Sequence, residues 1–437
     1  MTVVEMARGT VRDGVRRSVI WGLQRREDVG AQLMDPAVRA HPYPTYARIR
    51  AAGPLVQSQL GWYAAGHAAV ERVLRDPAFG HGQSAGADTG ASGIVAAAMQ
   101  PQRPPHLVDP VGPESMIGMD PPDHTRLRRL VSKVFTPKAI EALRPRLEGI
   151  AHDLLDGPSR AVSFDLMRDV AGALPVLAIC EVLGIPSVDR ARFKAWGGDI
   201  AVALDLTAPA PAQRRANRAL EALHRYFEDL FEQRRRQPGD DLVSELLAVE
   251  EQGETLTSHE LMATCLLLLL AGFETTVNLL GNGTQALLDH PDQVALLRAD
   301  PSLLPGAVEE MLRYDAPVQL TGRMALQDTA VEGVAVPAGQ FVVTLIGGAN
   351  RDPAVFAEPD RFDVTRANAR RHLAFIAGPH HCLGAALARL EGEVGFAALL
   401  DRLPELRAAG PAERRRTFVL RGLERLPLAG GRPVRTT

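Results

Sequence analysis

Residues 375–384 read FIAGPHHCLG, and the apolar spacing of residues 385–400 predicts a helix directly after them. A glycine and a proline before Cys382 favour a tight turn. The following helix would point its first N–H groups at the sulfur, which lowers the pKa of a thiol and stabilises the thiolate. Such a thiolate can ligate haem iron. From this pattern alone an inert buried cysteine remains the alternative, and a zinc site is disfavoured because no second cysteine lies at ligand spacing.

A second feature lies upstream, where residues 271–276 read AGFETT within a long apolar stretch. Glu274 and Thr275 are polar in a run where a buried charge is costly unless it is paired or solvated. Gly272 would let a group approach the helix backbone, or let the helix open locally. An acid beside a hydroxyl suits proton delivery to oxygen in a dry cavity. A surface turn is the alternative, but the apolar run continues at Val277.

Two further pairs of polar residues share helix faces. Glu310 and Arg313 stand three residues apart, and His124 and Arg128 stand four apart after a proline-rich segment. Most such pairs are exposed and contribute little on their own. His124 and Arg128 could jointly bind an anion such as a carboxylate, although a solvated helix face has the same pattern.

The remaining pattern predicts a mainly α fold with a small β portion. Helical periodicity dominates from His124 to Arg313, and residues 80–122, rich in glycine and then in proline, predict a long loop. Thr257 and Glu260 form a capping box ahead of the long apolar helix. The expected strands are 331–336, 340–346 and 416–428, with a turn at 337–339. The expected domains are an arginine-rich N-terminal extension at 1–30 and a single unit at 31–437, because no repeat or linker divides the chain.

The composition is that of an ordinary globular chain: 437 residues, 46% hydrophobic and 23% charged. Forty-nine basic and fifty-two acidic residues leave a net charge of -3, so no general basic surface for nucleic acid is indicated. Three cysteines provide no disulfide framework, and the apolar stretch 261–273 is shorter than the ~20 residues of a membrane helix. Because the N-terminus also lacks a secretory signal pattern, we expect a cytoplasmic protein without a membrane span.

Taken together, these features resemble the cytochrome P450 family of haem-thiolate monooxygenases, in particular its soluble bacterial members. The cysteine segment matches the family pattern Phe-x-x-Gly-x-His-x-Cys-x-Gly, residues 271–276 match Ala-Gly-x-Glu-Thr-Thr, and residues 310–313 match Glu-x-x-Arg. Residues 350–363 are similar to the segment before the haem loop, and the resemblance extends from about Asp35 to Leu428. It implies a cytochrome P450-like helical prism with a small β-sheet region, haem b (iron protoporphyrin IX) as cofactor, and insertion of one oxygen atom from O2 into a small molecule.

The resemblance also implies roles for individual residues. Cys382 would be the axial ligand of the iron, with Phe375 packed beside its sulfur, and Glu310 with Arg313 would be structural. Four basic side chains would hold the haem propionates: His124, Arg128, Arg323 and His380. The residues that would act on dioxygen are Glu274 and Thr275 as a proton relay, and Ala271 and Gly272 as the lining of its binding place.

One position departs from the family pattern. Residue 376 is isoleucine, where family members usually have glycine or another small residue. Because a β-branched side chain tolerates positive φ poorly, we expect this turn to adopt a φ that isoleucine accepts. Gly378 and Gly384 match the pattern, so the assignment of Cys382 stands.

The segments that meet the substrate in this family are mostly aliphatic here and carry few charges. They are 93–99, 200–206, 267–273, 318–321, 346–347 and 418–420. This composition favours a sizeable, largely apolar substrate, such as a polyketide, a macrolide or a lipid-like natural product.

The electron source is expected to be a separate ferredoxin with its ferredoxin reductase, because no flavin or iron–sulfur motif lies in the chain. Arg126, Arg129 and Arg389 are candidates for docking an acidic partner, and a monomer is the family default. Two other functions stay open. One is a peroxide-using haem enzyme, which the pair Glu274–Thr275 argues against. The other is a non-catalytic recruitment domain of the same fold, which would have lost motifs that are intact here.

Overall fold

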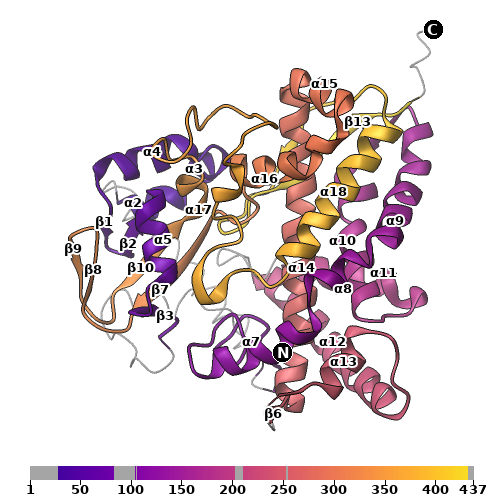
Figure 1. Cartoon of the computed structure of the whole chain (residues 1–437), viewed down its shortest axis with the longest axis horizontal. Coiled ribbons are helices and arrows are strands. Elements are labelled where there is room, and N and C mark those ends of the chain that lie inside the picture. The colour runs from indigo at the N-terminus through magenta and orange to yellow at the C-terminus, as the bar shows by residue number, and fades with distance from the viewer. Residues whose placement is uncertain (1–27, 83–103, 105, 202–209, 252–253, 432–437) are drawn as a thin grey trace.

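The computed structural model describes residues 28–82, 104, 106–201, 210–251 and 254–431. Most of this chain is helical, and a smaller region with the main sheet and the helices nearest the N-terminus lies beside the helical part (Figure 1). The helices are α2 (Val29–Leu33), α3 (Pro36–Ala40), α4 (Tyr43–Ala52), α5 (His67–Arg75), α7 (Asp123–Val134), α8 (Pro137–Glu141), α9 (Arg144–Asp156), α10 (Leu174–Val182), α11 (Arg190–Ala201), α12 (Ala210–Arg236), α13 (Leu242–Ala248), α14 (Ser258–Asp289), α15 (Pro291–Ala299), α16 (Leu304–Tyr314), α17 (Ile346–Ala349) and α18 (Ala385–Arg402).

The central helix is α14, which packs against α10, α11, α16 and α18. It begins with the predicted capping box, in which the Thr257 side chain accepts from the Glu260 N–H and the Glu260 side chain accepts from the Thr257 N–H. The helix is long and apolar enough to cross a membrane, but 83% of its most apolar window is buried inside the protein. A helix that is apolar on all sides and buried in this way is typical of the middle of a core.

The main sheet has five strands in the order β1-β2-β10-β7-β3. They are β1 (Val56–Ser58), β2 (Gly61–Ala64), β3 (Phe79–Gly80), β7 (Leu320–Ala325) and β10 (Phe341–Leu345). Val342 of β10 lies opposite Arg323 in an antiparallel pair and opposite Trp62 in a parallel pair. Side chains of this sheet and of α5 form a core of their own beside the larger helical core. Strand β7 was not predicted from the sequence.

The described residues also form four two-stranded sheets. They pair β4 (Ser163–Asp165) with β13 (Pro427–Ala429), β5 (Glu250–Glu251) with β6 (Glu254–Thr255), β8 (Thr329–Val331) with β9 (Val334–Val336), and β11 (Glu413–Arg414) with β12 (Leu423–Arg425). The prediction of one strand at 331–336 is wrong, because Glu332 and Gly333 turn the chain with φ values of 47° and 85°. Two successive positive φ values are typical of a tight hairpin turn. The predicted strand at 340–346 is confirmed as β10, but it pairs within the main sheet and not with this hairpin.

For the described part of residues 124–313 the helical prediction is confirmed, apart from the short strands β4, β5 and β6. The predicted loop begins with β3 and runs through turns over residues 106–122. Residues 83–103 and 105, which include the expected substrate segment 93–99, lie outside the described residues, as do 202–206 and 1–27. Helix α2 begins at Val29, inside the predicted N-terminal extension, and the division into an extension and one domain stays a prediction.

Candidate active site

The cysteine loop is a tight turn that α5 holds on one side. Cys382 lies three residues before α18, and its N–H donates to the carbonyl of Phe375 at 3.0 Å. Gly378 has a φ of 71°, and a Cβ at this position would lie 2.4 Å from the carbonyl oxygen of Leu74. Only glycine accommodates both the positive φ and the close approach, so Gly378 fixes the loop against the end of α5.

The sulfur of Cys382 is less acidic than predicted. Burial raises the pKa of Cys382, and the N–H of Gly384 with the charges of Arg128 and Arg389 lowers it without offsetting the burial. The predicted lowering of this pKa is therefore wrong for the protein by itself. The physical reason is that desolvation of the thiolate outweighs the field of the helix end, which falls off within one turn. A thiol of this kind is deprotonated when it coordinates a metal.

The expectation for Ile376 is also wrong. Ile376 has a φ of 51°, a left-handed conformation that costs an ordinary residue about 1–2 kcal/mol. Its N–H donates to the carbonyl of Leu373 at 2.8 Å, and its side chain packs against the core of the sheet region. The turn is held by Gly378 on one side and by the hydrogen bond from Cys382 to Phe375 on the other. The loop therefore retains this strain.

Three histidine rings lie together beside the cysteine loop. The ring centroids of His124 and His380 are 4.0 Å apart, and those of His81 and His380 are 4.8 Å apart. Burial, followed by neighbouring cationic groups, lowers the pKa of all three, to about 4 for His81 and to about 2 for His380. The rings are therefore neutral at pH 7. His81 was missed from the sequence because it lies on the far side of the long loop, and the carboxylate of Asp120 holds it there by accepting from its N–H at 2.8 Å.

Arg128 and Arg323 lie with these histidines, and the five residues are called the basic cluster below. Arg323 of β7 is 3% exposed and donates to the carbonyl of Gly322 at 2.7 Å. Burial lowers its pKa to about 10 despite the opposing charge of Asp120. Both ring nitrogens of His124 are buried without a hydrogen-bond partner. A buried cation beside unpartnered nitrogens is costly, which indicates that the cluster is built to receive an anion.

One face of α14 is left open around residue 271. Ala271 is exposed, and Gly272 and Thr275 are half-buried, although most of the helix is buried. The hydroxyl of Thr275 donates to the carbonyl of Ala271 at 2.7 Å, a local bond that a threonine in a helix commonly makes. The structure thus brings three of the predicted residues to one accessible face of the helix.

Glu274 is engaged by a residue that sequence reasoning missed. Its side chain is 3% exposed and accepts a hydrogen bond from Arg415 Nη1 at 2.5 Å. Burial raises the pKa of Glu274, Arg415 lowers it, and Glu424 raises it further. Nε of Arg415 lies 3.4 Å from the exposed carboxylate of Glu424. No local pattern pairs Glu274 with Arg415, because 141 residues separate them.

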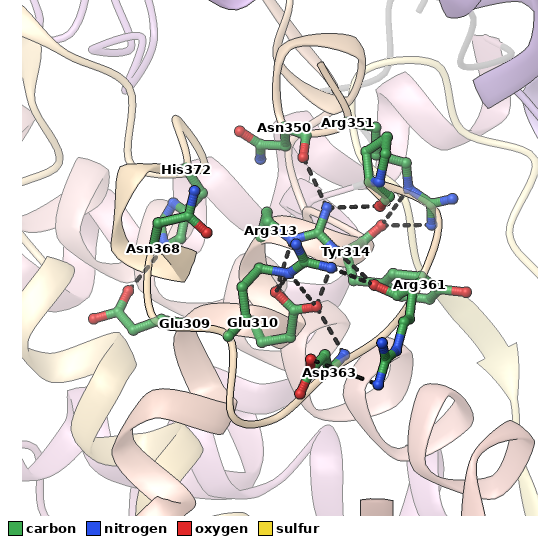
Figure 2. Close-up of polar contacts among 12 residues, drawn as sticks. Glu309, Glu310, Arg313, Tyr314, Asn350, Arg351, Arg361, Asp363, Asn368 and His372 are labelled. Carbon is green, nitrogen blue, oxygen red and sulfur yellow. Dashed lines mark hydrogen bonds and ion pairs between the residues drawn. The ribbon is translucent and has the colours of Figure 1, made fainter. Parts of the chain in front are cut away.

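Glu310 and Arg313 form a fully buried ion pair at the end of α16 (Figure 2). The guanidinium donates to the carboxylate through Nε at 2.7 Å and Nη2 at 2.9 Å. Arg313 also donates to the carbonyls of Asn350, Pro359 and Arg361. The pair therefore ties α16 to the irregular segment that leads toward the cysteine loop.

Known proteins are similar to this chain in sequence and in fold. The Cytochrome P450 family model matches residues 195–404. Cytochrome P450 140 of Mycobacterium tuberculosis is 42% identical over 428 residues, which cover 94% of each chain. The chain belongs to the cytochrome P450 family. The 6-deoxyerythronolide B hydroxylase of Saccharopolyspora erythraea is 46% identical over 313 residues, 71% of this P450 and 76% of that enzyme. The solved structure of PksS, the bacillaene polyketide synthase cytochrome P450 of Bacillus subtilis 168, has a TM-score of 0.80 at 35% identity and covers 92% of this chain and 99% of its own.

Members of this family carry a haem iron, and the residues of this P450 fit that group. The basic cluster, with its unpartnered His124 nitrogens, matches the negative charge of propionate groups. Among the described residues, no group of three or more histidine, cysteine or acidic side chains could hold a metal ion. A site with one cysteine therefore suits an iron that a porphyrin already holds. The predictions of a mainly α P450 fold and of a monooxygenase are confirmed by these relatives.

The three arginines predicted to dock an electron donor are all engaged in ion pairs within this P450. Arg126 pairs with Glu260, Arg129 with Glu254 at 3.1 Å, and Arg389 with Glu309 at 2.7 Å. They therefore do not form a patch of free positive charge, and their docking role stays a prediction.

Glu391 of α18 is a buried acid that sequence reasoning also missed. It is 1% exposed, its side chain is hydrogen-bonded to Thr276 of α14, and its Oε2 has no hydrogen-bond partner. Burial raises the pKa of Glu391 to about 8, and the Thr276 hydroxyl offsets only part of this. The carboxyl group is therefore protonated at pH 7, one residue from Thr275 on the helix that it faces.

Replacing Glu391 with glutamine is expected to stabilise the P450 at alkaline pH. The folded protein holds this proton more tightly than the unfolded chain. The stability that the bound proton contributes is therefore fully present below pH 4.5 and is lost as the pH rises through about 8. Glutamine keeps the shape and the neutral state without titrating. Calorimetry should show a Tm gap between E391Q and wild type that widens from pH 4.5 to pH 8 and then levels off. Glu148→Gln, at an exposed position of α9, should show no such widening, and a constant gap in E391Q would contradict the assignment.

Proposed function

We propose that this P450 inserts one oxygen atom from O2, by hydroxylation or epoxidation, into a sizeable and largely apolar small molecule of the polyketide, macrolide or lipid-like class. The observation that carries the proposal is the contact among three distant segments that themselves have no ionisable side chain. The N–H of Gln319 donates to the carbonyl of Val419 at 2.9 Å, and the N–H of Gly347 donates to the carbonyl of Gln319 at 3.2 Å. Residues 318–321, 346–347 and 418–420 thus lie side by side without an ionisable side chain.

The relatives support the same substrate class. One is named as a hydroxylase of 6-deoxyerythronolide B, and another as the P450 of a polyketide synthase. The open face of α14 at Ala271 follows an unbroken run of five buried leucines at 266–270, so the helix around this face is apolar. An apolar pocket with few polar groups favours ligands that bind through buried apolar area.

Spectral titration of the purified P450 tests the substrate class. Macrolactones and long-chain fatty acids are expected to shift the haem spin state at micromolar concentrations, whereas small aromatic acids should not. Selective binding of small aromatic acids, with no response to macrolactones or fatty acids, would show that the proposed substrate class is wrong.

The site residues receive the following proposed roles. Cys382 ligates the iron of haem b, with Phe375 beside its sulfur, and the bound haem supplies the binding and activation of dioxygen. Ala271 and Gly272 leave room for dioxygen on the open face of α14. The propionates are held by His124, Arg128, Arg323 and His380. We add His81, because its ring contacts that of His380.

Glu274 and Thr275 are proposed to relay protons, and Thr275→Ala tests the relay. Without the hydroxyl, oxygen consumption should continue while product per O2 falls at least about tenfold, since general acid catalysis typically contributes about 10²–10⁴-fold. Oxygen-electrode and product measurements in parallel give this ratio. Thr264→Ala is the matched control, because Thr264 is a buried threonine of the same helix whose hydroxyl has no hydrogen-bond partner. Full coupling in T275A would exclude the relay.

The partners follow from the same proposal. Electrons come from a separate ferredoxin and ferredoxin reductase, since no flavin or iron–sulfur motif lies in the chain. The protein is proposed to work as a cytoplasmic monomer. The single apolar helix of membrane-spanning length among the described residues is the buried α14, which supports a protein without a membrane span.

A further inference from the structure

The carboxylate of Glu309 points away from that of its neighbour Glu310 (Figure 2). Glu310 faces Arg313, whereas Glu309 faces the segment before the cysteine loop. Glu309 is 1% exposed and accepts hydrogen bonds from His372 Nε2 at 2.8 Å and from Arg389 Nε at 2.7 Å. These donors come from two different segments, so one buried acid of α16 joins the approach to the loop with the helix that follows it.

The ring of His372 is held by two partners. Its Nδ1 accepts from the N–H of Ala374 at 3.1 Å, and its Nε2 donates to Glu309 at 2.8 Å. His372 is thus fixed at both ring nitrogens. Ala374 directly precedes Phe375, and the histidine ring lies 5.7 Å from the Phe375 ring. The contact with Glu309 therefore fixes the backbone immediately before the aromatic side chain.

Arg389 supports Phe375 from a second direction. Its guanidinium carbon lies 4.5 Å from the centroid of the Phe375 ring, within the range of a cation–π contact. Glu309 also accepts from Nη2 of Arg389 at 3.3 Å, so both donors of the guanidinium fork meet the same carboxylate. The carbonyl of Phe375 in turn accepts from the N–H of Cys382. Both side chains that contact the Phe375 ring, His372 and Arg389, are thus hydrogen-bonded to Glu309.

The charge of Arg389 also acts at the sulfur. Its guanidinium lies over the ring of Phe375, and the carbonyl of Phe375 accepts the hydrogen bond from the N–H of Cys382, so the cation lies next to the cysteine loop. Glu309 accepts from this guanidinium and neutralises its charge. Burial alone would raise the pKa of Glu309, but the hydrogen bonds from His372 and Arg389 bring it to about 2, so the acid is ionised at any working pH.

We propose that Glu309 is a positioning residue that sets the electronic environment of the Cys382 sulfur by holding His372 and Arg389 against Phe375. The inference rests on the proposed role of Cys382 as the iron ligand. Its physical content is a set of opposite charges, in which Glu309 also pairs with the exposed Arg370 through Nε at 3.4 Å. Removing the anion leaves the cation of Arg389 uncompensated near the thiolate, and removing Arg389 leaves the anion with only this exposed cation. An uncompensated cation favours the added electron on reduction, and an uncompensated anion opposes it.

Two variants of the holoenzyme test the proposal by potentiometric titration. Glu309→Gln should raise the midpoint potential of the haem iron, and Arg389→Met, which keeps the apolar stem, should lower it. If Glu309 and Arg389 only held the loop in place, both substitutions would loosen the loop and shift the midpoint potential in the same direction. Glu309→Asp, which keeps the charge, should lie nearer to wild type than Glu309→Gln does. Glu393→Gln is the matched control, because it breaks another ion pair of α18, with Arg144 at 2.9 Å, and should leave the potential unchanged.

The outcomes separate the inference from the proposed function. A wild-type protein without the red-shifted carbon monoxide band would overturn the thiolate assignment itself. A normal band in wild type, combined with no shift in either variant or with shifts of the same sign, would overturn only the role of Glu309. If E309Q does not retain haem, the comparison of Arg389→Met with Arg389→Lys tests the proposal, because lysine keeps the positive charge. Equal midpoint potentials in these two variants contradict the proposal.

Discussion

Replacing Cys382 with alanine is expected to remove the red-shifted absorption band of the reduced, carbon monoxide-bound P450 and to abolish monooxygenation. The band reports a thiolate on the iron, and the thiolate supplies the electron density that favours O–O cleavage. The basic cluster does not depend on the sulfur, since its five residues come from three other segments as well as the loop. We therefore expect C382A to bind haem more weakly than wild type but not to lose it completely.

The other two cysteines provide matched controls for this experiment. Cys180 in α10 and Cys265 in α14 are buried, and burial raises the pKa of both thiols, to about 12 for Cys180. Cys180→Ala and Cys265→Ala should keep the red-shifted band. A band that survives in C382A would contradict the assignment. A wild-type band at the ordinary position would indicate a protonated sulfur, in line with the raised pKa of Cys382, and would make the strained Ile376 the first residue to replace.

Glu310→Gln is expected to destabilise the fold by about 3–5 kcal/mol, because breaking a buried ion pair leaves an uncompensated charge. Glu310 and Arg313 are both fully buried. The carboxylate also accepts from the N–H of Asp363 at 2.9 Å and from Arg366 at 3.2 Å, so its loss affects two further donors. Urea unfolding followed by circular dichroism, together with haem retention, measures the effect.

The control for this variant is an ion pair of the same type on the surface. Glu358 and Arg361 are also three residues apart, at 3.5 Å, and their side chains are 75% and 59% exposed. Glu358→Gln should change the stability by about 0–1 kcal/mol. An equally small effect of E310Q would mean that the buried pair contributes no more than an exposed one, which would contradict the structural role of Glu310.

The sequence by itself determined the features that local geometry dictates. The capping box of Thr257 and Glu260 and the shared face of Glu310 and Arg313 depend on helix spacing alone, and the structure reproduces them. The order of the motifs around Cys382 was sufficient to identify the family, because each motif is contiguous in the chain. A contiguous motif requires no knowledge of which distant segments meet.

The tertiary structure decided everything that depends on distant partners and on burial. Arg415 reaches Glu274 across 141 residues, and Arg389 reaches Glu309 across 80 residues; neither contact has a local signal. The strained φ of Ile376 results from packing of the whole loop against α5 and the sheet region, which overrides the preference of a β-branched residue. The raised pKa of Cys382 likewise follows from burial, since desolvation depends on what surrounds a group in space and not on its neighbours in the sequence.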